Sequence, residues 1–126
     1  MRQKKENNSK ATGNDGEAIA RQHLQGMGYT ILETNWRFKR YEVDIIAKSG
    51  QVLVFVEVKT RKSDTFGEPE LFVDRQKQNF LVAAAQQYIM QHNIDLEARF
   101  DIIAVLQLNN TNTVKHLEAA FYPQAK

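Results

Sequence analysis

The sequence predicts an α/β fold in which helices flank a mixed five-stranded β-sheet, with the elements in the order α-β-β-β-α-β-β. Residues 51–60 are rich in valine and alternate with a period of two, which is typical of a central strand. Asp74 then begins a helical pattern that lasts to about His92, and residues 98–106 form another apolar strand. A strand, a helix and a strand in this order indicate a parallel crossover, which is right-handed in almost all proteins.

The chain is expected to form a single domain preceded by a polar tail. Its 126 residues suit one domain that buries roughly two-thirds of its unfolded surface. Residues 1–13 are low in hydrophobicity and are predicted to be a disordered tail, so that residues 14–126 form the folded domain. The tail has no apolar core of a secretory signal, and no apolar run approaches the roughly 18 residues of a membrane span. The absence of cysteine excludes disulfides and thiolate sites, and we expect a cytoplasmic protein.

Capping and turn residues divide the first third of the chain. Asn14 or Asp15 can cap a first helix that runs to about Met27 and ends at Gly28. Residues 29–35 predict a short strand.

The next six residues are both basic and aromatic, and residues 36–41 either continue this strand or form an exposed loop. Trp36 and Phe38 could stack on nucleobases, although a place in the hydrophobic core is the favoured alternative.

A hairpin is predicted in the middle of the chain. Ser49 and Gly50 join residues 42–48 to the valine-rich strand as a two-residue turn. This turn sets Lys48 opposite Gln51 and thereby fixes the pairing of the two strands.

The predicted register gathers charged side chains on one side of the sheet. It places Asp44 opposite Phe55 and Glu42 opposite Glu57, and directly paired residues share a face. Lys59 follows on the same face by the period-two alternation. Asp44 and Glu57 would be diagonal neighbours, whereas Glu42 is the least certain member because it lies farther out. A slip of one residue would separate the group.

The second half of the chain supplies the rest of the sheet. Residues 61–73 read as a polar loop, and the helix that follows has an apolar stripe for packing. Residues 114–121 form the last strand after an asparagine-rich turn.

Two neighbouring carboxylates at the border of a core need compensation, which a divalent cation would provide. Mg²⁺ prefers one or two carboxylates together with waters and a substrate phosphate. Asp44, Glu57 and the carbonyl of Val58 could supply the protein ligands for Mg²⁺ or Mn²⁺. Lys59 could orient a water or neutralise charge on the phosphate. This chemistry is that of a metal-dependent nuclease.

Glu17 is a further candidate for the same site. It shares a helical stripe with Ala20, Leu24 and Met27, so it could point along the sheet toward a metal. The favoured alternative is a glutamate that stabilises the start of the helix, paired with Arg21.

Charge gives a partial indication of a nucleic-acid partner. The net charge is +2 and its excess lies within residues 1–15, so the remainder is formally neutral. Local basic clusters nevertheless flank the carboxylates, although solvated strand ends and a lysine extended from a helix are the plain alternatives. The candidate nucleic-acid-binding residues are Arg37, Lys39, Arg40, Arg61, Lys62, Arg75 and Lys77.

One further charge interrupts an apolar strand. Asp101 is more readily explained as a structural partner of a basic residue than as a metal ligand. His23, His92 and His116 fit no metal-ligand spacing, and no role is assigned to them.

The arrangement of Asp44, twelve residues, and then Glu57, Val58 and Lys59 resembles the PD-(D/E)xK nuclease superfamily, with Glu17 on a preceding helix. The layout looks like that of archaeal Holliday-junction resolvases, and the chain is more specifically similar to the YraN-like family of predicted bacterial nucleases. The matching segments are Gly16-Glu17, Gly28-Tyr29, Asn35-Trp36-Arg37, Glu42 to Ala47, Phe55 to Arg61, Phe66-Gly67, Lys77 and Arg99-Phe100-Asp101.

The resemblance implies a restriction-endonuclease-like core with Mg²⁺ held among the motif residues. Val43 departs from the pattern, because the name-giving proline would precede the aspartate at this position. The implied activity is Mg²⁺-dependent endonucleolytic hydrolysis of DNA, with branched or recombination intermediates as candidate substrates. Asp44, Glu57, Lys59 and Glu17 would be its catalytic residues.

Two other functions remain open from the sequence. The same fold could serve as a non-catalytic nucleic-acid-binding module, or as a protein-interaction scaffold in which the charges form only a salt-bridge network. A homodimer that pairs two active faces would present more basic surface than a monomer.

Overall fold

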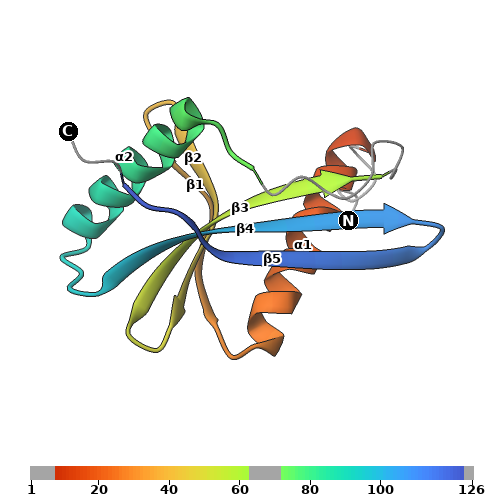
Figure 1. The fold of residues 1–126 in the computed structure, drawn as a ribbon, viewed down its shortest axis with the longest axis horizontal. Helices are drawn as coiled ribbons and strands as arrows, with labels where there is room; N and C mark the ends of the chain where they lie inside the picture. Colours follow the sequence, from red (N-terminus) through yellow and green to blue (C-terminus); the bar gives the residue numbers. More distant parts are fainter. Residues whose placement is uncertain (1–7, 63–71, 124–126) are drawn as a thin grey trace, which may run out of the picture.

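The predicted α/β class and element order are confirmed by a computed structural model, which describes residues 8–62 and 72–123, with side chains from residue 15 (Figure 1). One mixed sheet has the strand order β1-β2-β3-β4-β5, in which β3 and β4 run parallel and the other neighbours run antiparallel. The elements are α1 Asn8–Gly26, β1 Thr30–Phe38, β2 Tyr41–Ser49, β3 Val52–Arg61, α2 Arg75–Gln91, β4 Glu97–Leu108 and β5 Thr111–Phe121.

The first helix begins six residues earlier than expected. α1 starts at Asn8, so residues 8–13, predicted to belong to a disordered tail, are helical, and residues 1–7 lie outside the described part. An asparagine or aspartate inside a helix costs under about 1 kcal/mol relative to alanine, so residues that can cap a helix are also tolerated within one. The helix can therefore run through Asn14 and Asp15. The domain boundary at residue 14 stays a prediction.

The end of α1 lies close to its predicted position. The helix ends at Gly26, and Gly28 takes a φ of +93°, a conformation in which a residue with a side chain is strained. Met27 was expected on the buried stripe but is 46% exposed, because the helix has already ended. Residues 36–38 of the ambiguous segment 36–41 continue β1, residues 39–40 form a turn, and Tyr41 begins β2.

The predicted register of the central hairpin is wrong, and its turn explains why. Ser49 pairs with Val52, so Gly50 and Gln51 form the two-residue loop. Gly50 has a φ of +60°, and glycine at the first loop position is the pattern of a type II′ turn. Each pair is shifted by two positions relative to the prediction, and an even shift does not change the face of a side chain in a regular strand. The alternation of β2 is nevertheless broken near Asp44, because Val43 lies in the same core as Ile46, so the predicted common face does not extend to Glu42.

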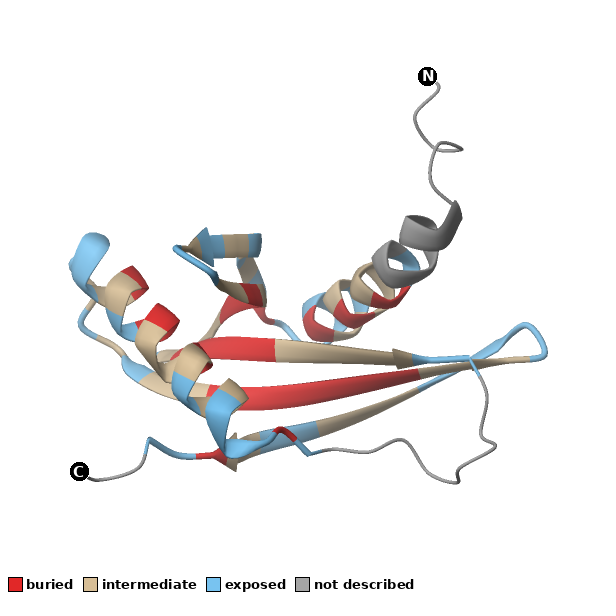
Figure 2. Ribbon diagram, turned by 90° about the horizontal axis from the view of Figure 1, so that it is seen from above, coloured by how far each residue is buried: buried red, intermediate tan, exposed pale blue. Residues whose placement is uncertain are grey.

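The two helices cover opposite faces of the sheet. Phe55 and Ile102 belong to the core beside α2, whereas Val54, Val56 and Ile103 belong to the core beside α1. Alternate residues of a strand point to opposite faces, so the central strands are buried on both sides. In Figure 2 these buried residues form continuous bands along the middle of the sheet.

A glycine brings α1 close to the central strand. A Cβ atom at Gly16 would clash with Oγ1 of Thr60 and lie 3.1 Å from its Cβ. The helix can approach β3 this closely because the glycine has no side chain. Glu17, the next residue, is thereby held near the end of the sheet at which β3 finishes.

Gly16→Ala is expected to lower the free energy of unfolding by about 1–3 kcal/mol, the usual cost of overpacking a tight contact. Urea denaturation measures the change. Gly26→Ala is the matched control, because nothing lies within 4 Å of a Cβ there. Adding Thr60→Ala should restore part of the loss, and a Gly16→Ala variant as stable as the wild type would contradict the close contact.

Candidate functional site

The candidate site lies where β2 and β3 stop pairing. The last pair of their ladder is Ile45 with Val56, and the next position on each strand carries a carboxylate, Asp44 and Glu57. The backbone N–H of Val58 donates to Oδ2 of Asp44 at 2.7 Å, instead of to the backbone of β2. The carboxylate thus takes the place of a strand partner where β2 and β3 stop pairing.

The structure therefore brings Asp44 and Glu57 together, although not in the predicted pairing. Burial and the charge of Glu57 raise the pKa of Asp44 to about 7, and the N–H of Val58 opposes this shift. Glu17 raises the pKa of Asp44 further, whereas Lys77 lowers it. A carboxyl group with this pKa is one whose negative charge lacks compensation.

Glu57 is in a similar state but lies closer to cations. Burial raises its pKa, while the charges of Lys77 and Lys59 act to lower it. Nζ of Lys77 lies 3.7 Å from Oε1 of Glu57, so α2 contributes a cation to the site. The two carboxylates and this lysine form the electrostatic centre of the site.

Lys59 lies on the wall of a cavity beside these groups. Its Nζ donates to the backbone carbonyl of Phe72, which precedes α2. The cavity has a volume of about 360 Å³ and opens to solvent. It is lined by Glu57, Lys59, Phe72, Val73, Asp74 and Lys77.

Glu17 approaches the site from the other helix without joining a cluster of three ligands. Its Oε1 accepts a hydrogen bond from Nδ2 of Asn35 at 3.0 Å, and its charge acts on Asp44. Within the described residues, no group of three or more histidine, cysteine, aspartate or glutamate side chains could hold a metal ion. A cation at this site would have two carboxylate ligands, Asp44 and Glu57.

Glu42 lies outside this centre. It forms an exposed ion pair with Arg37, its partner across β1 and β2, at 3.3 Å. Its charge raises the pKa of Glu57, but by less than burial, Lys77 and Lys59 shift it.

The candidate nucleic-acid-binding residues fall into two groups. The turn between β1 and β2, with Lys39 and Arg40, lies beside the start of α2, and Tyr41 packs on Phe80 with ring centroids 4.9 Å apart (Figure 1). Arg37 lies on β1 just before this turn, and Arg75 and Lys77 lie at the start of α2. Arg61 and Lys62 are exposed at the far end of β3. Of these residues, as far as the described part of the chain shows, Lys77 contacts a carboxylate of the site, that of Glu57.

The aromatic residues of β1 are packing residues. Trp36 packs against the core beside α2, with its ring edge-to-face to Tyr88 at 5.2 Å. Phe38 stacks on Trp36 at 6.4 Å, and Nζ of Lys39 lies over its ring. The expectation of core positions is confirmed for Trp36.

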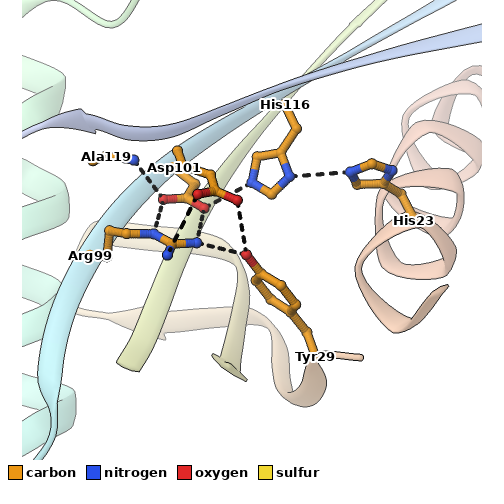
Figure 3. A network of polar contacts seen from close by, with 7 residues as sticks. His23, Tyr29, Arg99, Asp101, His116 and Ala119 are labelled. Carbon is orange, nitrogen blue, oxygen red and sulfur yellow. Dashed lines mark hydrogen bonds and ion pairs between the residues drawn. The ribbon is translucent and has the colours of Figure 1, made fainter. Parts of the chain in front are cut away.

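Asp101 has the structural role expected for it (Figure 3). Its carboxylate is 1% exposed and accepts from Nε and Nη2 of Arg99 at 2.9 and 2.8 Å, from Nε2 of His116 at 2.8 Å and from the N–H of Ala119 at 3.0 Å. Burial acts to raise its pKa, but the hydrogen bonds outweigh burial and lower it. Nη2 of Arg99 also donates to the hydroxyl of Tyr29 at 2.7 Å.

Two histidines extend this network to the first helix, a role that the sequence did not reveal. Because a carboxylate only accepts, Nε2 of His116 donates to Asp101, and Nδ1 of His116 forms a hydrogen bond of 3.2 Å with Nε2 of His23. His23 belongs to α1, and burial together with His116 lowers its pKa. These residues are 93 positions apart, so no local spacing could have indicated the contact.

Comparisons with known proteins identify the family of this chain. Residues 16–105 match the model of the uncharacterised protein family UPF0102. The chain belongs to this family. It is 48% identical over 110 residues to the UPF0102 protein FP2501 of Flavobacterium psychrophilum, covering 87% of this chain and 92% of the relative. It is 46% identical over 123 residues to a UPF0102 protein of Geotalea daltonii, covering 96% and 97% of the two chains.

The fold is also similar to that of a solved structure. The Holliday junction resolvase Hjc of Archaeoglobus fulgidus superposes with a TM-score of 0.51 at 17% identity, covering 84% of this chain and 76% of the resolvase. The likeness supports the restriction-endonuclease-like fold class. In the described part of the chain, no helix has the length and apolar character needed to cross a membrane.

Asp44→Asn is expected to stabilise the metal-free protein at high pH. The unfolded carboxyl ionises near its ordinary pKa of 3.8 and the folded one near 7, so stability falls as pH rises between these values and the full loss is present above about 7. Asparagine cannot ionise and can still accept from Val58. In EDTA the variant should be more stable than the wild type by about 2–4 kcal/mol at pH 8, and the difference should vanish toward pH 4.

Urea unfolding across this pH range measures the effect, with the exposed Asp95→Asn as the control. A gain that is independent of pH would show that the charge of Asp44 is not its cause.

Asp101→Asn is expected to destabilise the fold by about 3–5 kcal/mol, because it leaves Arg99 and His116 around an uncompensated centre. Breaking the exposed pair with Arg37→Gln should cost under about 1 kcal/mol. Both are measured by urea unfolding at pH 7. Equal small losses would mean that the buried network contributes no more than a surface ion pair.

Proposed function

We propose that the protein is a divalent-metal-dependent endonuclease that hydrolyses phosphodiester bonds of DNA. One observation carries the proposal: Asp44 and Glu57 are held together, partly buried, at the opening between β2 and β3. Two carboxylates in this position repel each other and destabilise the metal-free fold. A bound cation would relieve this repulsion, and the paired carboxylates are therefore best explained as ligands of a cation.

The donor set fits Mg²⁺ or Mn²⁺. Two carboxylates with room for water and a phosphate are what Mg²⁺ prefers, and the site has no sulfur or imidazole ligand that would favour softer metals. The N–H of Val58 faces Asp44, and in an extended strand the carbonyl of the same residue points to the same side. Val58 is thus a suitable third ligand. The metal would polarise the phosphoryl group and lower the pKa of a bound water.

The remaining residues act on the substrate. Nζ of Lys59 and of Lys77 lie on the cavity wall beside Glu57, where they would neutralise charge on a phosphate. Lys59 would also orient the attacking water. Glu17, fixed by Asn35 on the other side of Asp44, would assist through a water molecule.

Two features support DNA with a branched structure as the substrate. Basic residues lie on both sides of the site, at the turn between β1 and β2 with the start of α2, and at the end of β3. The solved neighbour of similar fold is a Holliday junction resolvase. Because the body of the chain is formally neutral, a homodimer would present a larger basic surface than a monomer.

The test is cleavage of linear, flapped and four-way DNA in the presence of Mg²⁺ or Mn²⁺. Wild-type protein is expected to cut, and Glu57→Gln and Lys59→Ala should each lower the rate by at least about 100-fold, since each removes a charge acting on the transition state. Glu97→Gln is the control, because this exposed carboxylate begins β4 away from the site. Activity that persists equally in all variants would identify a contaminating nuclease.

A non-catalytic nucleic-acid-binding module is the second candidate. It is favoured by the ion pair between Lys77 and Glu57, which already partly compensates one carboxylate. Calorimetry with Mn²⁺ separates the two functions: the nuclease binds the metal and loses it in Asp44→Asn. DNA binding that needs Arg37 and Lys62, without any metal binding, would favour the module.

A further inference from the structure

We propose that Phe72 stacks on a nucleobase and that the substrate therefore carries an unpaired nucleotide beside the scissile phosphate. The inference rests on the proposed nuclease function and names the substrate class of that site. Phe72 is 59% exposed and lies on the wall of the cavity that also contains Glu57, Lys59 and Lys77.

The exposure of Phe72 sets it apart from comparable residues. Among the phenylalanines in the described part of the chain, the other members are buried or half-buried. Phe80, eight residues later, packs on Tyr41, and Phe100 stacks on Phe121. An aromatic ring left in water forfeits the free energy of burial, and here it does so beside three charged groups of the site.

The backbone from this ring to the start of α2 is fixed by several contacts. The carbonyl of Phe72 accepts from Nζ of Lys59, and Val73, the next residue, is only 5% exposed within the core beside α2. The carbonyl of Val73 accepts from Nε2 of Gln78 at 2.8 Å, and Asp74 caps the helix by accepting from the N–H of Lys77. A ring on a fixed support loses little conformational entropy when a ligand stacks on it.

The cavity offers both kinds of contact that a nucleotide needs. Its volume of about 360 Å³ falls in the range of roughly 300–1,000 Å³ that is usual for small-ligand sites. Lysine cations suit the phosphate, and the aromatic face suits the base. Since both line the same cavity, one nucleotide could contact Phe72 with its base and Lys77 with its phosphate.

The choice of an unpaired nucleotide follows from stacking itself. In an intact duplex each base is covered on both faces by its neighbours, so a protein ring stacks on a paired base only after base steps are forced apart, which costs about a few kcal/mol per step, whereas an unpaired or extruded base is open to it. A flap, a junction branch point or a single strand supplies such a base without the cost of unstacking. Intact duplex does not.

The experiment uses the full chain in EDTA, so that binding is measured without cleavage. The probe is a DNA flap with 2-aminopurine, whose fluorescence falls on stacking, at the unpaired position next to the branch. A matched duplex carries the same base in a pair. The variants are Phe72→Ala, Phe72→Leu and Phe72→Trp. Met90→Ala is the control, because Met90 is an apolar residue near the end of α2 that is 73% exposed.

The wild type is expected to bind the flap and quench its fluorescence. Phe72→Ala should weaken flap binding by roughly 5- to 150-fold and abolish the quenching, as alanine substitution does at base-stacking sites. Phe72→Trp should retain both, and Met90→Ala should change neither. Phe72→Leu, apolar but without a ring, should behave like the alanine variant.

Quenching by Phe72→Ala at the wild-type level would overturn the inference, as would equal losses on flap and duplex. Wild-type quenching by Phe72→Leu would also overturn it, because an apolar contact would then suffice. If the wild type cleaves DNA and Phe72→Ala keeps its preference for flaps, the stacking role fails and the nuclease stands. Quenching that depends on Phe72 in a protein that never cleaves DNA would overturn the nuclease and leave the stacking intact. A wild type that binds neither probe would overturn the stacking inference, and the cleavage assay with Mg²⁺ or Mn²⁺ decides the nuclease separately.

Discussion

The hydrogen bond from the N–H of Val58 to the carboxylate of Asp44 is the interaction on which the site depends. It lies where the ladder between β2 and β3 ends, and it satisfies a backbone donor that would otherwise lack a strand partner. Because a side chain replaces the neighbouring backbone, the two strands can separate without leaving a buried N–H unpaired. The opening that results is the place where Asp44 and Glu57 meet.

The helices on the two faces of the sheet deliver one charged residue each to this opening. α2 brings Lys77 to Glu57, and α1 brings Glu17 within electrostatic reach of Asp44. The position of α1 is fixed at two points. Near its middle Gly16 lies against Thr60, and near its end His23 bonds to the buried network of β4 and β5. The network of Asp101 therefore supports the site indirectly, by holding the helix that carries Glu17.

Regular features of the chain could be predicted because they depend on local periodicity. The alternation along β2 and β3 placed Asp44 and Glu57 on one side, and this conclusion survived a wrong register because the error was an even number of positions. The register itself depends on which residue of the turn has positive φ, and Gly50 could occupy either loop position. The start of α1 was missed because capping residues also occur inside helices.

Contacts between distant segments could not be predicted in the same way. The bond between His23 and His116 joins α1 to β5, and neither histidine has a neighbour in sequence that marks it. The cavity beside Lys59 likewise depends on how the segment before α2 returns to the sheet, which brings Phe72 to the site. Periodicity determines the face on which a residue lies, whereas only the packed chain determines what it meets there.

The energetic state of the carboxylates connects the stability of the fold with its proposed chemistry. Repulsion between Asp44 and Glu57 lowers the free energy of unfolding of the metal-free chain. This loss of stability is present at a pH at which both carboxylates would be charged. The proposed cation would release the same repulsion, so the stability lost in its absence would add to the affinity for it. The hydrogen bond from Val58 opposes the pKa shift of Asp44 and thereby favours the ionised form that a metal requires. The site is therefore only partly preorganised: its geometry is set by the sheet, and its charge is completed by what binds there.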